Sequence, residues 1–238
     1  YHVAPLPAVQ DHKRLLPDDK GPNTGGMGSY SCADGLLPFL SKQEYHEGVS
    51  ILQHIIQALA KEHCTYIGPI YGQFILTSHG VKLIEVNARF GDPEAMNVLP
   101  LLQTDFLDVC TAMLDASLSK KDIQIEKKST VCKYVVPEGY GVKSMTGEPI
   151  YVNEEALRKT GAMLFYASVN KKDNHILTGS SRSLAVVGIH DDFAEAEKIS
   201  EHALTCIKGD HLFIRHDIGT TQLLEKRIRH MKEIRGKK

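Results

Sequence analysis

Three polar side chains alternate along a strand-like segment at residues 85–89: Glu85, Asn87 and Arg89. Side chains two positions apart on a strand point to the same face of its sheet. The neighbouring apolar residues predict a buried strand, where a polar row is costly unless something satisfies it. A divalent cation and a phosphate chain would do so, since carboxylate and amide oxygens suit Mg²⁺ and a guanidinium suits phosphate. The alternative is an ordinary solvent-facing strand with a Glu–Arg pair.

A hairpin with its turn at residues 78–80 is expected to position this row. With a three-residue loop, Thr77 faces Val81, and counting back places Gln73 opposite Glu85 on the same face. Gln73 would then supply a third oxygen. A slip of one residue would turn Gln73 to the other face, so the expectation depends on the register.

A glycine-rich segment at residues 21–30 reads Gly-Pro-Asn-Thr-Gly-Gly-Met-Gly-Ser-Tyr. Successive backbone amides in such a segment can cradle phosphate oxygens. It lacks the Gly-Lys-Ser/Thr ending of a Walker A loop and does not follow a hydrophobic strand, so this motif alone favours a flexible surface loop. Residues 10–14, Gln-Asp-His-Lys-Arg, precede it, and a solvated turn would account for them.

The turn after the polar row, residues 90–94, reads Phe-Gly-Asp-Pro-Glu. Asp92 is predicted as the N-cap of the next helix. Pro93 is predicted in its first turn, where a missing N–H group costs nothing. A plain capping turn explains Asp92, but not why the cap directly follows Arg89.

Residues 10–35 show no helical or strand period and predict a long loop, and Ser41 with Glu44 predicts a capping box. Helices are expected at residues 42–63, 94–118, 192–207 and 220–238. Strands are expected at residues 68–77, 81–88, 130–136, 163–169, 176–178, 183–189 and 212–215. This order predicts an α+β fold with a domain boundary near residue 122.

The composition is that of an ordinary globular chain: 238 residues, 42% hydrophobic and 24% charged, with a formal net charge of -1. That charge argues against nucleic acid and anionic membranes as partners. Five widely spaced cysteines predict neither a zinc site nor a disulfide framework, and favour the reducing cytoplasm. Tyr1 is not a natural initiator, so we expect the chain to be a fragment.

Residues 10–14, 21–28 and 85–94 together resemble glycinamide ribonucleotide synthetase (phosphoribosylamine–glycine ligase), a family of the ATP-grasp superfamily. The Glu-x-Asn-x-Arg element is shared across ATP-grasp ligases. The Arg-Phe-Gly-Asp-Pro-Glu extension and the Gly-Pro-Asn-Thr-Gly-Gly-Met-Gly loop point to this family. The resemblance continues through residues 180–182 and 215–219, and covers nearly all of the chain.

The resemblance implies that residues 1–122 are the second half of an ATP-grasp catalytic domain and residues 123–238 a C-terminal α+β domain. It implies a ligase that joins glycine to phosphoribosylamine, with ATP and Mg²⁺ or Mn²⁺ as cofactors and glycyl phosphate as the intermediate. The metal ligands would be Gln73, Glu85 and Asn87. Arg89, Lys13 and Asp92 would act in catalysis, Arg89 by stabilising charge on the transferred phosphoryl group. Contacts with substrates or phosphate would come from Asp11, His12, Arg14, Gly25, Gly26, Gly28 and Pro93.

The family also has an N-terminal substrate domain, an ATP lid and an adenine-binding hinge, which would lie before Tyr1. This missing part of the same enzyme is therefore the expected partner, and the fragment alone is expected to be inactive. Two alternatives stay open: another ATP-grasp carboxylate–amine ligase or biotin-type carboxylase, and a non-catalytic ATP-grasp remnant.

Overall fold

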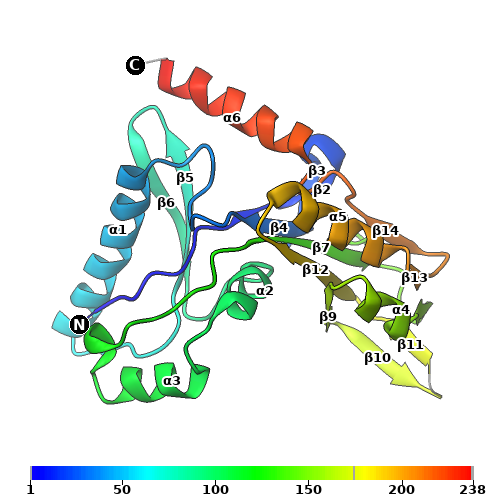
Figure 1. Ribbon diagram of the computed structural model, residues 1–238, viewed down its shortest axis with the longest axis horizontal. Helices are drawn as coiled ribbons and strands as arrows, with labels where there is room; N and C mark the ends of the chain where they lie inside the picture. Colours follow the sequence, from blue (N-terminus) through cyan, green and yellow to red (C-terminus); the bar gives the residue numbers. More distant parts are fainter. Residues whose placement is uncertain (1, 174, 237–238) are drawn as a thin grey trace.

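A computed structural model describes residues 2–173 and 175–236 and confirms the α+β class (Figure 1). Its centre is an antiparallel six-stranded sheet in the order β1-β4-β7-β12-β9, with β14 also pairing with β7. These strands are β1 (Gln10–Asp11), β4 (Gly28–Ser31), β7 (Ser129–Pro137), β9 (Met163–Tyr166), β12 (Leu184–His190) and β14 (Leu212–Ile214).

Strand β7 is buried along its whole length because alternate side chains enter different cores. Val135 packs in a cluster with Leu184 and Val186. Val136 points the other way, into a cluster with Met27 and Ile218. Helix α5 (Phe193–Leu204) packs against β7 and β12.

A smaller four-stranded sheet, in the order β10-β11-β8-β13, lies beside the central one (Figure 1). Its elements are β8 (Pro149–Val152), β10 (Val169–Lys172), β11 (His175–Thr178) and β13 (Ile207–Lys208), with α4 (Glu154–Lys159) nearby. Strand β8 and helix α4 were not expected from the sequence. Their runs of four and six residues are too short to show a clear period.

A hairpin lobe occupies the other side of the molecule (Figure 1). It consists of α1 (Lys42–Lys61), β5 (Tyr71–Thr77), β6 (Gly80–Asn87) and α3 (Phe106–Leu114). The predicted capping box is confirmed, because Ser41 Oγ accepts from the Glu44 N–H and the Glu44 carboxylate accepts from the Ser41 N–H. Strands β5 and β6 form a two-stranded sheet of their own.

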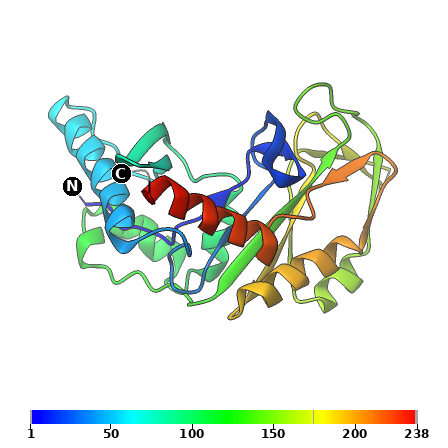
Figure 2. The same ribbon diagram turned by 90° about the horizontal axis from the view of Figure 1, so that it is seen from above.

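Helix α6 (Thr221–Gly236) connects the two sides (Figures 1 and 2). It begins beside the central sheet and extends toward the hairpin lobe. Near its end, Arg235 donates to the Phe39 carbonyl at 2.8 Å and to the Glu44 carboxylate at 2.6 Å. These bonds tie the C-terminal helix to the start of α1.

The predicted long loop at residues 10–35 is wrong in part. The structure places β1, β2 (Arg14–Leu16), the 3₁₀ turn η1 (Pro17–Asp19), β3 (Lys20–Asn23) and β4 within it. The pairing of these strands explains the difference. β1 pairs with β4, and β4 pairs with β7, which lies more than 90 residues later in the sequence. Such long-range pairing leaves no local period to detect.

The single helix predicted over residues 94–118 is also wrong. The segment forms α2 (Glu94–Val98), the 3₁₀ turn η2 (Leu99–Leu101) and α3. Pro100 lies at the interruption, where its ring cannot continue an α-helix. A new helix then begins with Asp105 as its N-cap, accepting from the Leu107 N–H.

The central sheet draws strands from both sides of residue 122, β1 and β4 before it and β7, β9, β12 and β14 after it. The division at that residue stays a prediction. All five cysteines are free thiols. Within residues 2–173 and 175–236, no helix is long and apolar enough to cross a membrane.

Candidate functional site

The β5–β6 hairpin confirms that Gln73 lies opposite Glu85, but by a different route from the predicted one. The turn has two residues, so Thr77 pairs with Gly80 rather than Val81. A bulge then follows, because Gln73 pairs with Glu85 and the next pair is Phe74 with Leu83. The extra residue shifts the register by one and restores the expected pairing.

Glu85 and Asn87 present their side chains on one face, as predicted, since Asn87 Nδ2 donates to Glu85 Oε1 at 3.2 Å. The predicted burial of the row is wrong. Glu85 and Arg89 are exposed and Asn87 is half-buried. The physical reason is that, in the described part of the chain, β5 and β6 pair only with each other and form a two-stranded sheet apart from the central one.

Arg89 does not extend the row of polar side chains that Glu85 and Asn87 form on β6. Strand β6 ends at Asn87, so alternation along the strand no longer fixes the direction of the Arg89 side chain. Its Nη1 donates to the carbonyl of the adjacent Phe90 at 2.7 Å. The guanidinium is therefore exposed beside the row and free to turn toward an anion.

Asp92 is not the predicted N-cap. Pro93 holds that position in α2, and no side-chain capping bond is present there. Both Asp92 oxygens bind elsewhere: Oδ1 accepts from the Tyr134 hydroxyl at 2.8 Å and Oδ2 from Arg182 Nη2 at 2.8 Å. Asp92 thus fastens the turn after β6 to the central sheet.

Arg182 links this turn to the glycine-rich segment. Its Nη1 donates to the carbonyls of Gly25 at 3.0 Å and of Asp92 at 3.1 Å, and lies 3.4 Å from that of Gly26. Its guanidinium carbon is 4.6 Å from the centre of the Tyr134 ring, within cation–π range. From the sequence, Arg182 was recognised only as part of residues 180–182, which share the family resemblance. Its one available signal was a charged residue directly before a buried strand.

Gly26 and Gly28 have positions that only glycine fits. Gly26 has φ +121, and an added Cβ would come within 2.7 Å of Asp11 Oδ1. Gly28 has φ +152, and an added Cβ would collide with the backbone carbonyl of Cys132 on β7. Gly28 is thus required for the close approach of β4 to β7, and its predicted contact with phosphate stays a prediction.

Residues 11–14 lie in three different places: at a cavity, in the protein interior and at the β2–β3 turn. Asp11 lines an apolar cavity in the hairpin lobe, between α1, β5 and α3, and Lys13 Nζ lies 3.2 Å from Asp11 Oδ2. His12 is fully buried, with Nδ1 3.0 Å from Asp19 Oδ1, and burial lowers its pKa. This placement does not support the predicted contact between His12 and substrate. Arg14 donates to the Gly21 carbonyl at 2.8 Å, which closes the β2–β3 turn.

Asp11 has an unusual electrostatic environment. Burial, and then the negative charge of Glu94, raise its pKa to about 7, while Lys13 opposes the shift. Because this folded-state pKa lies above the ordinary value of 3.8, ionised Asp11 costs folding free energy as pH rises from about 4 to about 7. Such a shift marks a candidate functional group.

The donors at the end of β6 fit a hard divalent cation. Glu85 supplies a carboxylate, Gln73 an amide oxygen, and rotation of the Asn87 amide would present its oxygen as well. Among the described residues, no three His, Cys, Asp or Glu side chains come together as a metal site. A cation held here would therefore take further oxygens from phosphate, the coordination that Mg²⁺ commonly adopts.

Two family models match the sequence. Residues 1–95 match the ATP-grasp (A) domain of phosphoribosylglycinamide synthetase, and residues 130–221 match the C domain of the same protein. A phosphoribosylamine–glycine ligase of Methanocella arvoryzae is 52% identical over 236 residues, which are 99% of this chain and 53% of the relative. The ligase of Methanobrevibacter smithii is 52% identical over 98% of this chain and 53% of its own length.

A solved structure of the same family also matches the chain. The crystal structure of phosphoribosylamine–glycine ligase from Thermotoga maritima superposes with a TM-score of 0.76 at 26% identity. The match covers 90% of this chain and 51% of that one. The chain thus spans about half the length of the curated relatives and of the solved structure that it matches.

Proposed function

Because the chain belongs to the phosphoribosylglycinamide synthetase family, with its ATP-grasp and C domains, we propose that it forms part of the active site of phosphoribosylamine–glycine ligase. The proposed reaction joins glycine to 5-phosphoribosylamine and gives glycinamide ribonucleotide, ADP and phosphate through glycyl phosphate. This is a step of purine synthesis, and we place it in the cytoplasm.

One observation carries the proposal: three oxygen-bearing side chains meet on one face of the β5–β6 hairpin, directly before a turn fastened to the glycine-rich segment. Gln73 lies opposite Glu85, and Asn87 contacts Glu85 at 3.2 Å. Arg182 then joins the Asp92 turn to Gly25. Metal donors and a phosphate-binding segment are thereby held in one region.

Gln73, Glu85 and Asn87 would hold Mg²⁺ or Mn²⁺. A cation held by these residues would supply positive charge against the phosphate oxygens of ATP. Arg89, exposed beside these residues, turns toward the transferred phosphoryl group and stabilises its charge. The glycine-rich segment, Gly25, Gly26 and Gly28, contacts phosphate oxygens through its backbone. The N–H groups of Gly25 and Gly26 donate to the hydroxyls of Tyr140 at 3.2 Å and Thr24 at 3.1 Å, and phosphate oxygens would replace these two acceptors.

The remaining substrate contacts are proposed for the residues beside this segment. Lys13, which lies beside Asp11, and Arg14, which also bonds the Gly21 carbonyl, would supply positive charge for phosphate or acyl phosphate. Asp92 acts by holding the turn, since both of its oxygens bind protein groups. Pro93 lies against Gly26, where an added Cβ would come within 2.8 Å of Pro93 Cδ.

The partner we propose is the other half of a protein of the relatives' length. An apolar cavity of about 1030 Å³ opens in the hairpin lobe between α1, β5 and α3. Several large apolar side chains of this lobe are exposed, among them Ile75 at 50%, Ile84 at 55% and Leu107 at 73%. Apolar surface of this kind on a folded chain marks an interface.

A chimera tests the function directly. This chain would replace the matched half of the Methanocella arvoryzae ligase, and ADP release would be measured with glycine and phosphoribosylamine each omitted in turn. We expect ADP release that needs both, and none from the chain alone. ADP release that ignores glycine would remove the proposed reaction, and a chimera that binds ATP without turnover would indicate a non-catalytic remnant.

A further inference from the structure

A network of fully buried polar side chains joins α2 to β4 and β7. Asn97 lies on α2, and its Oδ1 accepts from the Ser29 hydroxyl. Its Nδ2 donates to Thr130 Oγ1 at 2.9 Å and to the Ser29 carbonyl at 3.3 Å. Thr130 Oγ1 is also 2.7 Å from Ser31 Oγ. None of these four residues is exposed to solvent, so the network makes its hydrogen bonds entirely within the protein.

The register of the two strands brings the three hydroxyls to one face of the central sheet. Ser29 and Ser31 are two positions apart on β4, and Thr130 on β7 lies directly opposite Ser31. Hydroxyls on a buried sheet face are costly unless the element packed on them offers matching donors and acceptors. Asn97 does so with a single amide, whose oxygen faces Ser29 and whose nitrogen faces Thr130.

Helix α2 depends on such contacts for its position. It has only five residues, and Pro93 at its N-cap position makes no side-chain capping bond. A helix of this length is not stable alone in water, so tertiary contacts decide where it lies. Apolar contacts tolerate small rotations. An amide with a donor side and an acceptor side fits its partners in one orientation, and a fully satisfied buried network of this kind makes a structure rigid.

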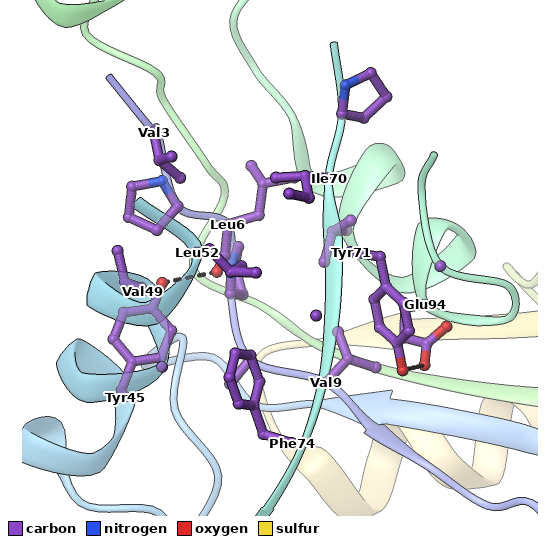
Figure 3. Close-up of a pocket in the computed structure, with 18 of the residues that line it drawn as sticks. Val3, Leu6, Val9, Tyr45, Val49, Leu52, Ile70, Tyr71, Phe74 and Glu94 are labelled. Carbon is purple, nitrogen blue, oxygen red and sulfur yellow. Dashed lines mark hydrogen bonds between the residues drawn. The ribbon is translucent and has the colours of Figure 1, made fainter. Parts of the chain in front are cut away.

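The network connects the two parts of the proposed site. On one side, Ser29 directly follows Gly28, which ends the part of the glycine-rich segment proposed to bind phosphate. On the other side, Glu94 lies one turn before Asn97 and accepts from the Tyr71 hydroxyl at 2.7 Å (Figure 3). Tyr71 is on β5, opposite the residue at which β6 ends. The hairpin end with the proposed metal donors is thereby linked to β4.

We propose that Asn97 is a positioning residue, which through α2 fixes the end of the β5–β6 hairpin relative to the glycine-rich segment. In the described part of the chain the hairpin pairs with no other strand, so side-chain contacts must set its distance from the central sheet. The inference rests on the proposed function, because this distance matters for catalysis only if metal-bound phosphates lie between the two parts. The network is separate from the bond between Arg182 and Asp92.

An apolar version of the network separates positioning from stability. Asn97→Leu, combined with Ser29→Ala, Ser31→Ala and Thr130→Val, removes donors and acceptors together, so no side chain of the network is left unpaired. Replacing all partners by apolar groups of similar shape is nearly neutral for stability. We therefore expect a melting temperature within about 4 °C of the parent's. The single orientation that the amide imposed on α2 is lost.

Relaxation-dispersion NMR of backbone amides tests the positioning on the chain itself, because it detects exchange on the microsecond-to-millisecond scale. We expect the apolar version to add exchange in α2, β5 and β6, and none in β12. Thr178→Val is the matched control. It removes an equally buried hydroxyl, which donates to the Met145 carbonyl at 2.9 Å, on β11 away from the hairpin (Figure 1). Hairpin amides that respond no more to the apolar version than to Thr178→Val overturn the proposal.

The chimera shows whether the reaction uses this positioning. The apolar version is expected to lower kcat for ADP release about 10–100-fold, since small displacements of reacting groups have effects of this size. The KM values for glycine and ATP should change by less than about threefold. Thr178→Val should keep the parental kcat. A parental kcat in the apolar version overturns the proposal, because the network would then serve folding alone.

Thr130→Val alone supplies a second test should the apolar version not fold. It removes one acceptor of Asn97 and should add exchange in the hairpin, which Thr178→Val should not. Added exchange in the hairpin, with a parent chimera whose ADP release ignores glycine, would keep the positioning and remove the proposed reaction. Glycine-dependent release in the parent chimera, with no added exchange in either variant, would do the reverse.

Discussion

Glu85→Gln in the chimera is expected to lower glycine-dependent ADP release by about 10³-fold. The substitution keeps the size of the side chain and its place opposite Gln73. It removes the one carboxylate among the three proposed metal donors. A neutral amide holds a hard cation far less well than a carboxylate does, and losing about 4 kcal/mol of transition-state stabilisation corresponds to this factor.

Glu155→Gln provides the matched control, because Glu155 is 81% exposed on α4 and pairs only with Lys159. Its rate is expected to match that of the parent chimera. Higher Mn²⁺ concentrations should partly rescue Glu85→Gln by mass action, and a circular dichroism spectrum equal to that of the parent chimera would exclude a folding defect. A Glu85→Gln chimera that turns over at the parent rate contradicts the metal role.

Arg182→Ala is expected to lower the free energy of unfolding of the chain by about 1–3 kcal/mol. The Arg182 side chain is 13% exposed, and it binds Asp92 and the carbonyls of Gly25 and Gly26. Its removal takes the protein donor from those acceptors, although Asp92, which is 49% exposed, can then bind water. Urea unfolding followed by circular dichroism measures the change.

Arg158→Ala is the control for that measurement, since Arg158 is 78% exposed in a helical pair with Glu154 and should contribute under about 0.5 kcal/mol. Arg182→Lys should recover only part of the loss, because an ammonium cannot reproduce the planar fork. In the chimera, Arg182→Ala should also reduce the rate, because the glycine-rich segment is no longer held beside the Asp92 turn. Equal effects of Arg182→Ala and Arg158→Ala would show that Arg182 does not fasten the two segments.

The hairpin shows how far the sequence can predict the candidate site. Alternation along β6 correctly placed Glu85 and Asn87 on one face, because that period is a property of the strand itself. The opposite position of Gln73 was correct only because two errors cancelled: a turn one residue shorter than expected and a bulge at Ile84. Bulges depend on packing and twist, for which the local sequence holds no rule.

The parts that the sequence could not predict depend on contacts between distant segments. β4 pairs with β7, more than 90 residues later, and β1 pairs with β4, so residues 10–35 carry no period of their own. The bond between Arg182 and Asp92 joins residues 90 positions apart. Asp92 looked like an N-cap because an Asp-Pro-Glu sequence commonly begins a helix, yet its carboxylate binds Tyr134 and Arg182. The helix break at Pro100 could have been predicted from the sequence, since proline interrupts helices.

Binding of Mn²⁺ with ATP to the chimera tests the central claim most directly, through paramagnetic broadening of side-chain amide NMR signals. The account predicts that the amide signals of Gln73 and Asn87 broaden, that Glu85→Gln removes the effect, and that Asn170 on distant β10 is unaffected. Broadening that spares Gln73 and Asn87, or that persists in Glu85→Gln, would contradict it.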